Sequence, residues 1–193
     1  MVSQALSQSA IASWQGNNQY PSTRDRDALS RGKILVTAQP HGFTGGHVSA
    51  TLSLRIFPDA LWPHLTDYPR WVDYFPEMTH SEAIAPTDQG QPRIYQVGRK
   101  SILGLGAEVE VYLRVQTHPP HRLQFVMERG TLADFTASFA LAPWRLGTLL
   151  TFTVQATPLI PLPGFFVEQS MRRELPTSLA QMRRVIEAIA HPA

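Results

Sequence analysis

Two glutamates separated by a single residue, Glu108 and Glu110, are the pair in this sequence that most suggests acid–base chemistry. Two carboxylates can divide the roles of general acid and general base when their surroundings push their pKa values apart. They alternate, however, with Val109 and Val111, so in a strand both glutamates point away from the apolar face. A solvated sheet surface is the ordinary place for such residues, and we interpret them as surface carboxylates.

A tyrosine and an arginine within an apolar strand face are more informative. Tyr95 and Arg99 share one face of a predicted strand with Val97. If this face points inward, the arginine must be paired or must reach a ligand headgroup or solvent, because a lone buried charge is very costly. We therefore predict that Tyr95 and Arg99 orient the polar end of a bound ligand.

Arg129 is in the same situation on another predicted strand, where it shares a face with Met127. It is a third candidate for holding the polar end of a ligand. The alternative is a structural ion pair with Asp134 across the turn at Gly130, because inward polar groups normally find partners within the protein.

No recognisable catalytic or metal-binding constellation occurs elsewhere in the sequence. The absence of cysteine excludes disulfides, thiolate metal ligands and a cysteine nucleophile. The seven histidines lack the spacing of a metal site, and there is no nucleophile elbow, dinucleotide fingerprint or phosphate-binding loop. We expect no cofactor and no metal, and the sequence leaves open whether any reaction is catalysed.

The length and composition are typical of one globular domain. With 193 residues, of which 43% are apolar and 17% charged, the chain can form one good core. The formal net charge of +2 comes with scattered arginines, so we predict no nucleic-acid partner. No apolar run reaches the roughly 18 residues of a membrane-spanning helix, and the N-terminus lacks the positive start of a signal peptide. We expect a cytoplasmic protein, with peripheral contact to a membrane as a further candidate.

The elements that must position these residues end with a long C-terminal helix at 163–190. Its apolar residues recur at intervals of three and four, which is typical of one face of an α-helix. They are Met171, Leu175, Leu179, Met182, Ile186 and Ile189. A helix of this length with a single apolar face needs a large apolar surface to pack against.

A series of predicted strands supplies that surface. Residues 48–56 alternate between apolar and polar, and a short β-prone segment at 34–39 precedes them. Two short helices, beginning at Pro58 and Arg70, follow that first main strand. Short turns between the later strands indicate an antiparallel sheet. These later strands are predicted at 78–85, 93–101, 107–117, 121–130, 132–144 and 148–157.

The first part of the chain differs from the rest. Residues 1–32 are rich in Ser, Gln and Asn and contain the charged run 24–27. Such a composition buries little apolar surface, so we predict a flexible N-terminal tail over 1–32 and a single domain over 33–193.

One stretch of the sequence resembles a known family. It reads Ala60-Leu61-Trp62-Pro63-His64-Leu65-Thr66-Asp67-Tyr68 and is followed by Trp71, Tyr74-Phe75-Pro76 and Ser81. These residues resemble the polyketide cyclase/dehydrase and lipid-transport group of the SRPBCC (START-like) superfamily, to which coenzyme Q-binding proteins belong. The closing segment from Leu175-Pro176 to Ile189 is similar to that family's last helix, and the resemblance covers residues 45–190.

The resemblance implies an α+β helix-grip fold. In this fold a curved antiparallel β-sheet, here of about seven strands, wraps around the long C-terminal α-helix, with two short helices after the first main strand. The resemblance also implies an apolar cavity between sheet and helix. The residues themselves agree, because a sheet with one apolar face and a one-sided helix must bury those faces together.

A set of apolar residues in the inward phase is predicted to line this cavity, together with the three polar candidates. Each of them individually is also an ordinary core residue, but the set favours an apolar ligand over a polar one. The predicted ligand-binding residues are Tyr95, Val97, Arg99, Val109, Val111, Phe125, Met127, Arg129, Phe135, Phe139, Phe152, Phe165, Phe166 and Met171.

Three functions follow from this reading. The favoured one is binding or transport of a hydrophobic small molecule, such as a lipid, an isoprenoid quinone or a polyketide-like compound, because it needs only a cavity and an opening. The first alternative is a polyketide cyclase/dehydrase-type enzyme that uses the same cavity, although no residue can be named as its base. The second alternative is a ligand-free protein-interaction subunit.

Overall fold

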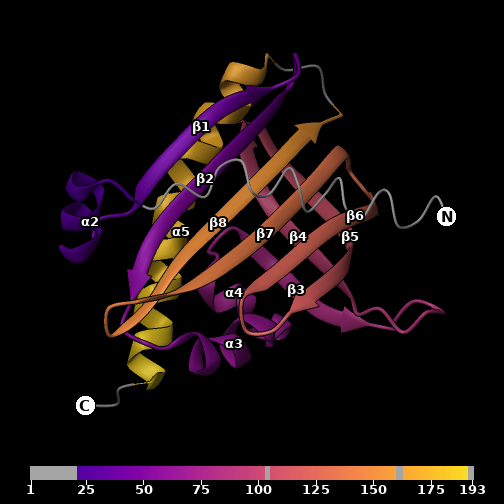
Figure 1. The fold of residues 1–193 in the computed structure, drawn as a ribbon. Helices are drawn as coiled ribbons and strands as arrows, with labels where there is room; N and C mark the ends of the chain where they lie inside the picture. The colour runs from indigo at the N-terminus through magenta and orange to yellow at the C-terminus, as the bar shows by residue number, and fades with distance from the viewer. Residues whose placement is uncertain (1–20, 103–104, 160–162, 191–193) are drawn as a thin grey trace, which may run out of the picture.

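An eight-stranded antiparallel sheet forms most of the molecule (Figure 1). The structure is a computed structural model that describes residues 21–102, 105–159 and 163–190. The strand order across the sheet is β1-β2-β8-β7-β6-β5-β4-β3, so the first hairpin lies next to the last strand. The strands are β1 Leu35–His41, β2 Gly45–Leu54, β3 Met78–Ile84, β4 Arg93–Ile102, β5 Leu105–His118, β6 Arg122–Gly130, β7 Leu132–Trp144 and β8 Gly147–Pro158.

The long helix α5, Gly164–Ala190, crosses one face of this sheet (Figure 1). Two short helices, α3 at Pro58–Thr66 and α4 at Trp71–Tyr74, lie between β2 and β3 and are joined by a 3-10 turn. The helix-grip fold is therefore confirmed, with eight strands in place of about seven because the β-prone segment before the first main strand pairs fully with β2. The predicted bounds of the strands and of α5 agree with the structure to within a few residues.

The start of α5 lies against the β1–β2 turn, and a glycine makes this close approach feasible. The Gly164 backbone nitrogen donates to the Phe43 carbonyl oxygen at 2.9 Å. A Cβ at position 164 would lie 2.8 Å from the Gly45 carbonyl oxygen, which is closer than real Cβ atoms come. The absence of a side chain at Gly164 thus fixes where the helix begins relative to the sheet.

An aromatic cluster joins α4 to the middle of the sheet. The Trp71 ring lies 5.1 Å from the Phe125 ring and 5.7 Å from the Phe139 ring, and Phe139 stacks on Phe152 at 4.1 Å between centroids. The Trp71 indole nitrogen donates to the Leu65 carbonyl oxygen at 3.1 Å, so the buried polar atom is satisfied. The two short helices therefore hold Trp71 against the inner face of the strands.

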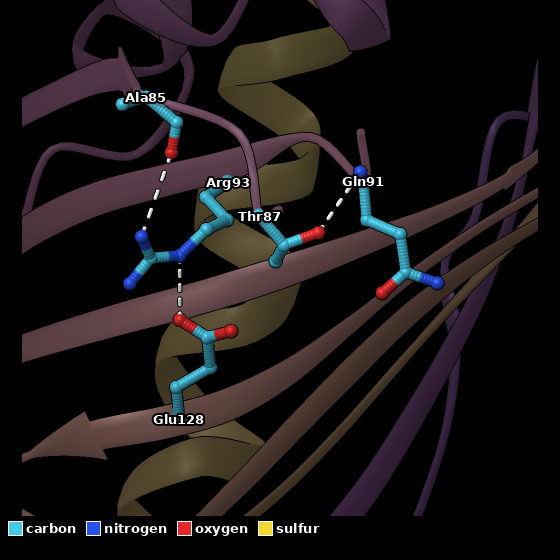
Figure 2. Close-up of polar contacts among 5 residues, drawn as sticks. All are labelled: Ala85, Thr87, Gln91, Arg93 and Glu128. Carbon is cyan, nitrogen blue, oxygen red and sulfur yellow. Dashed lines mark hydrogen bonds and ion pairs between the residues drawn. The ribbon is translucent and has the colours of Figure 1, made fainter. Parts of the chain in front are cut away.

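The other face of the sheet carries paired polar side chains. Arg93 on β4 reaches across β5 and donates from Nε to Glu128 on β6 at 2.7 Å, and its Nη1 contacts the Ala85 carbonyl oxygen (Figure 2). Thr87 accepts from the Gln91 backbone nitrogen and closes the β3–β4 connection (Figure 2). This is the solvent-facing side of the strands.

Part of the predicted N-terminal tail is a helix. Helix α2, Thr23–Ser30, is capped by Ser22, and its Leu29 is fully buried. The Leu29 carbonyl oxygen accepts from the Ser53 hydroxyl at 2.8 Å. The sequence predicted a flexible tail here and not a helix, because Leu29 follows a run of charged residues and gives no apolar pattern by itself. Residues 1–20 lie outside the described residues.

Candidate ligand-binding cavity

A cavity of about 550 Å³ lies between the inner face of the sheet and the first half of α5. Its walls come from β3 to β8, from α4 and from α5. The volume is within the range of about 300–1,000 Å³ that small-molecule sites occupy. The cavity is therefore large enough for a ligand of the size of a polycyclic or long-chain molecule.

Helix α5 contributes one continuous face to the cavity. Its lining residues recur at intervals of three and four, as expected for one side of an α-helix. They are Val167, Ser170, Met171, Glu174, Leu175 and Ser178. Only the first part of the predicted apolar stripe thus borders the cavity. Leu179, Met182 and Ile186 pack into the core, and Ile189 is exposed near the end of the helix.

Half of the residues predicted from the sequence lie together in the cavity wall. All of them are apolar, and Phe75 and Val154 join them. The predicted residues that line the cavity are Val97, Val109, Val111, Phe125, Phe135, Phe152 and Met171.

Four predicted apolar residues lie elsewhere. Phe139 is fully buried in the aromatic cluster, and Met127 packs against the core without bordering the cavity. Phe165 and Phe166 are 61% and 40% exposed in the first turn of α5. Aromatic rings usually fill cores, and the first turn of a helix need not face its cavity, so the apolar pattern alone placed these four wrongly.

Tyr95 and Arg99 do not line the cavity. They were predicted on the inner face of β4, but they lie on its outer face. Ile94 and Gln96 point inward, at 0% and 5% exposure. Tyr95 pairs with Tyr112 on the outer face, and its hydroxyl donates to Glu110 Oε1 at 2.8 Å. This hydrogen bond is the main reason that the pKa of Tyr95 is raised to about 12. Arg99 is exposed.

Arg129 is directed away from the cavity by a β-bulge. Tyr112 pairs with Arg129 whereas the next residue, Leu113, pairs with Met127, so Glu128 is an extra residue in β6. An extra residue reverses the alternation beyond it, which places Arg129 over the Tyr112 ring at 3.7 Å. The alternative ion pair is also absent from the described contacts, in which Asp134 lies 3.8 Å from His41.

The two glutamates differ in their positions. Glu110 accepts from Tyr95 on the outer face, as expected for a surface carboxylate. Glu108, in contrast, borders the cavity, and so does Glu77. Both are exposed, so they belong to the mouth of the cavity and not to its interior.

Two buried polar residues in the cavity wall were missed by sequence reasoning. Gln96 is 5% exposed and donates from Nε2 to Ser81 Oγ at 3.1 Å, and Ser178 is 8% exposed. A signal for Ser178 was available, since it follows Leu175 by three residues on the cavity-facing side of the helix. Gln96 gave no such signal because a polar residue beside Val97 favours the opposite assignment of the strand face.

Other kinds of site are not evident in the described part of the chain. It contains no group of three or more His, Asp or Glu side chains able to hold a metal ion. Within the same ranges, no helix combines the length and the apolar character that crossing a bilayer requires. The cavity is thus the feature on which a function can be argued.

The model of the polyketide cyclase/dehydrase and lipid transport family matches residues 46–187. The chain belongs to this family. The match covers all strands except β1, the two short helices and nearly all of α5, so it includes every wall of the cavity. No curated protein matches the chain.

Solved structures with the same fold come from proteins of different activity. A START superfamily protein from Mycobacterium smegmatis has a TM-score of 0.64 at 16% identity and covers 74% of this chain and 98% of its own. The Zhui aromatase/cyclase from Streptomyces sp. R1128 has a TM-score of 0.63 at 15% identity, over 77% and 97%. A STAR-related lipid transfer protein from Xanthomonas axonopodis has a TM-score of 0.60 at 15% identity, over 79% and 93%. At these identities the likeness establishes the fold alone.

Proposed function

We propose that this protein binds a hydrophobic small molecule in the cavity between the sheet and α5. The observation that carries the proposal is a cavity of about 550 Å³ whose interior walls are almost entirely apolar. The chain also belongs to the polyketide cyclase/dehydrase and lipid transport family. Lipids, isoprenoid quinones and polyketide-like compounds all have the required apolar surface. The lipid transfer and aromatase/cyclase neighbours support this class of ligand by analogy of fold.

The apolar walls supply the driving force. Burying about 400 Å² of apolar ligand surface contributes about 10 kcal/mol at about 25 cal/mol per Å². Loss of translational and rotational freedom on association opposes this with about 4–15 kcal/mol. The net affinity therefore depends on how completely the ligand fills the cavity and on its few polar contacts.

A cavity-filling variant tests the proposal. Ala137 borders the cavity, so Ala137→Phe should fill part of it and abolish uptake of a naphthalene dye whose fluorescence rises in apolar surroundings. Ala140→Phe is the matched control, because Ala140 lies on the same strand and its side chain is on the outer face, opposite Arg122 and Thr151. Uptake by wild type and Ala140→Phe but not by Ala137→Phe supports the cavity as the site. Equal uptake by all three proteins contradicts it.

We also propose that one end of the molecule contacts a membrane surface. Phe43, Leu159 and Phe165 are 97%, 65% and 61% exposed. Figure 1 shows the β1–β2 turn beside the first turn of α5, and Leu159 also borders the cavity. An exposed apolar group at the mouth of an apolar cavity suits the transfer of a ligand from a bilayer. Arg172 and Arg173 are exposed further along α5 and suit anionic headgroups.

Vesicle sedimentation checks this contact. The double change Phe43→Ser and Phe165→Ser should reduce binding to vesicles of phosphatidylcholine and phosphatidylglycerol, because it removes two apolar side chains from the contact surface. Leu146→Ser is the control, since Leu146 is 85% exposed but lies in the β7–β8 turn, away from the cavity. No sedimentation of the wild-type protein, or an equal loss with Leu146→Ser, would overturn the proposal.

A cytoplasmic location and the lack of a nucleic-acid partner stay predictions of the sequence.

A cyclase/dehydrase-type reaction in the same cavity is a second candidate. It is favoured by the position of Glu108 and Glu77, whose carboxylates border the cavity and are able to accept a proton. Tyr95 and Arg99, which were predicted to orient the polar end of a ligand, do not line the cavity and do not support a reaction there. Turnover of a poly-β-keto substrate that is lost in Glu108→Gln, with binding retained, would establish this candidate over a carrier.

A further inference from the structure

We propose that Gln96 and Ser178 form a polar subsite inside the cavity that receives one neutral oxygen function, a hydroxyl or a carbonyl group, of an otherwise apolar ligand. This inference rests on the proposed function. It specifies the polar group of the ligand, which the apolar walls alone do not determine. The two residues come from opposite walls, Gln96 from β4 and Ser178 from α5, and both border the cavity.

Ser178 is 8% exposed, and its hydroxyl has no hydrogen bond among the described contacts. A serine within a helix often satisfies its hydroxyl on the carbonyl oxygen four residues earlier. Its neighbour Thr177 contacts the Arg173 carbonyl oxygen in this way at 3.5 Å, and Ser170 donates to Glu174 at 2.7 Å. Ser178 is thus the hydroxyl on the cavity side of α5 that remains available to a ligand.

The Gln96 side chain is held in place and still has unused hydrogen-bonding capacity. Its Nε2 donates to the hydroxyl of Ser81, which is itself 6% exposed. A primary amide has two N–H donors and a carbonyl acceptor, and among the described residues this one donor is engaged. The carbonyl oxygen and the second N–H of Gln96 therefore suit a ligand hydroxyl or carbonyl group. A ligand group that pairs with them adds a hydrogen bond to an amide that is already held in place.

The subsite fits a neutral group better than an ionised one. Neither Gln96 nor Ser178 carries charge, so the pair cannot balance a carboxylate or an ammonium group removed from water. Among the described side chains that border the cavity none is Lys, Arg or His, whereas the carboxylates of Glu77, Glu108 and Glu174 repel an entering anion. The Glu174 carboxylate already accepts from the Ser170 hydroxyl at 2.7 Å. An alcohol, phenol, ketone or quinone on an apolar skeleton meets these conditions.

Three pyrene probes with one skeleton test the subsite: methylpyrene, pyrenemethanol and pyrenecarboxylate, titrated by fluorescence at neutral pH. The wild-type protein should bind pyrenemethanol about three- to tenfold more tightly than methylpyrene, the range expected for one net hydrogen bond. Pyrenecarboxylate should bind more weakly than pyrenemethanol. Ser178→Ala and Gln96→Met should each reduce the preference for pyrenemethanol, and the double variant should bind pyrenemethanol and methylpyrene equally.

Matched controls are available on the outer face. Gln124 and Ser138 are cross-strand neighbours there, so Gln124→Met and Ser138→Ala should keep the wild-type preference. Ser178→Ala removes one oxygen from a helical position and keeps the test decisive if Gln96→Met does not fold. Equal binding of pyrenemethanol and methylpyrene by the wild type, a preference that survives the double change, or tighter binding of pyrenecarboxylate than of pyrenemethanol each overturns the subsite. Failure of all three probes to bind the wild type overturns the proposed function itself.

Discussion

The two halves of α5 have the same apolar pattern and different partners. In the second half, Leu179, Met182 and Ile186 are fully buried against the sheet and the short helices. In the first half, Met171 and Leu175 are half-buried and border a cavity. A packed interior stabilises the fold, whereas an apolar wall without a partner is available to a ligand. The second half of α5 therefore holds the fold together, and the first half is the part that would contact the proposed ligand.

The largest expected effect comes from replacing one apolar side chain in each half of α5 by alanine. Leu179→Ala should lower the free energy of unfolding by about 2–5 kcal/mol, because it opens a hole in a packed core. Met171→Ala should cost about 1 kcal/mol or less, since its side chain already borders empty space and loses fewer contacts. Urea denaturation of both variants measures the difference. Equal losses of stability would mean that the first half of α5 is packed as tightly as the second.

An intermediate effect is expected where the first half of α5 is fixed to the sheet. Gly164→Ala places a Cβ 2.8 Å from the Gly45 carbonyl oxygen, and either the helix or the β1–β2 turn must move. The resulting overpacking should cost about 1–3 kcal/mol. Thermal unfolding gives the loss of stability, and the fluorescence of a bound apolar dye reports whether the cavity is altered as well. A variant with unchanged stability would show that this contact does not fix the helix.

The smallest effect is expected on the outer face, far from both halves of the helix. Arg93 and Glu128 form an ion pair at 2.7 Å, with side-chain exposures of 27% and 24%. Arg93→Ala should reduce stability by about 0–1 kcal/mol, because solvent screens such pairs, and less at high salt. Denaturation at low and at high salt concentration checks both statements. A change in ligand affinity with this variant would contradict the separation of the two faces of the sheet.

The sequence predicted the elements well and the assignment of their faces only in part. Strict alternation in β5 and the three-and-four spacing of α5 are strong local signals, so the bounds of both elements were close to correct. The reversed face of β4 was not predictable in the same way. The polar Gln96 points inward, whereas Tyr95 lies on the outer face opposite Tyr112, although Val97 between Gln96 and Gly98 borders the cavity as predicted.

Two further features depend on tertiary structure and have no local signal. The bulge at Glu128 turns Arg129 outward. It can be recognised only when the pairing of β6 with β5 is known. The extent of the cavity depends on where the sheet departs from the helix, so the stripe from Met171 to Ile186 did not reveal which of its residues face empty space. Apolar spacing predicts burial and does not distinguish a packed residue from a cavity wall.

The most direct test of the central claim is native mass spectrometry of the freshly purified protein, followed by organic extraction and identification of the released molecule. We predict one apolar molecule per chain, carrying a hydroxyl or carbonyl group, in the wild type and in the Ala140→Phe control, and none in Ala137→Phe. A wild-type protein that is consistently empty and takes up no apolar probe would contradict the binding function.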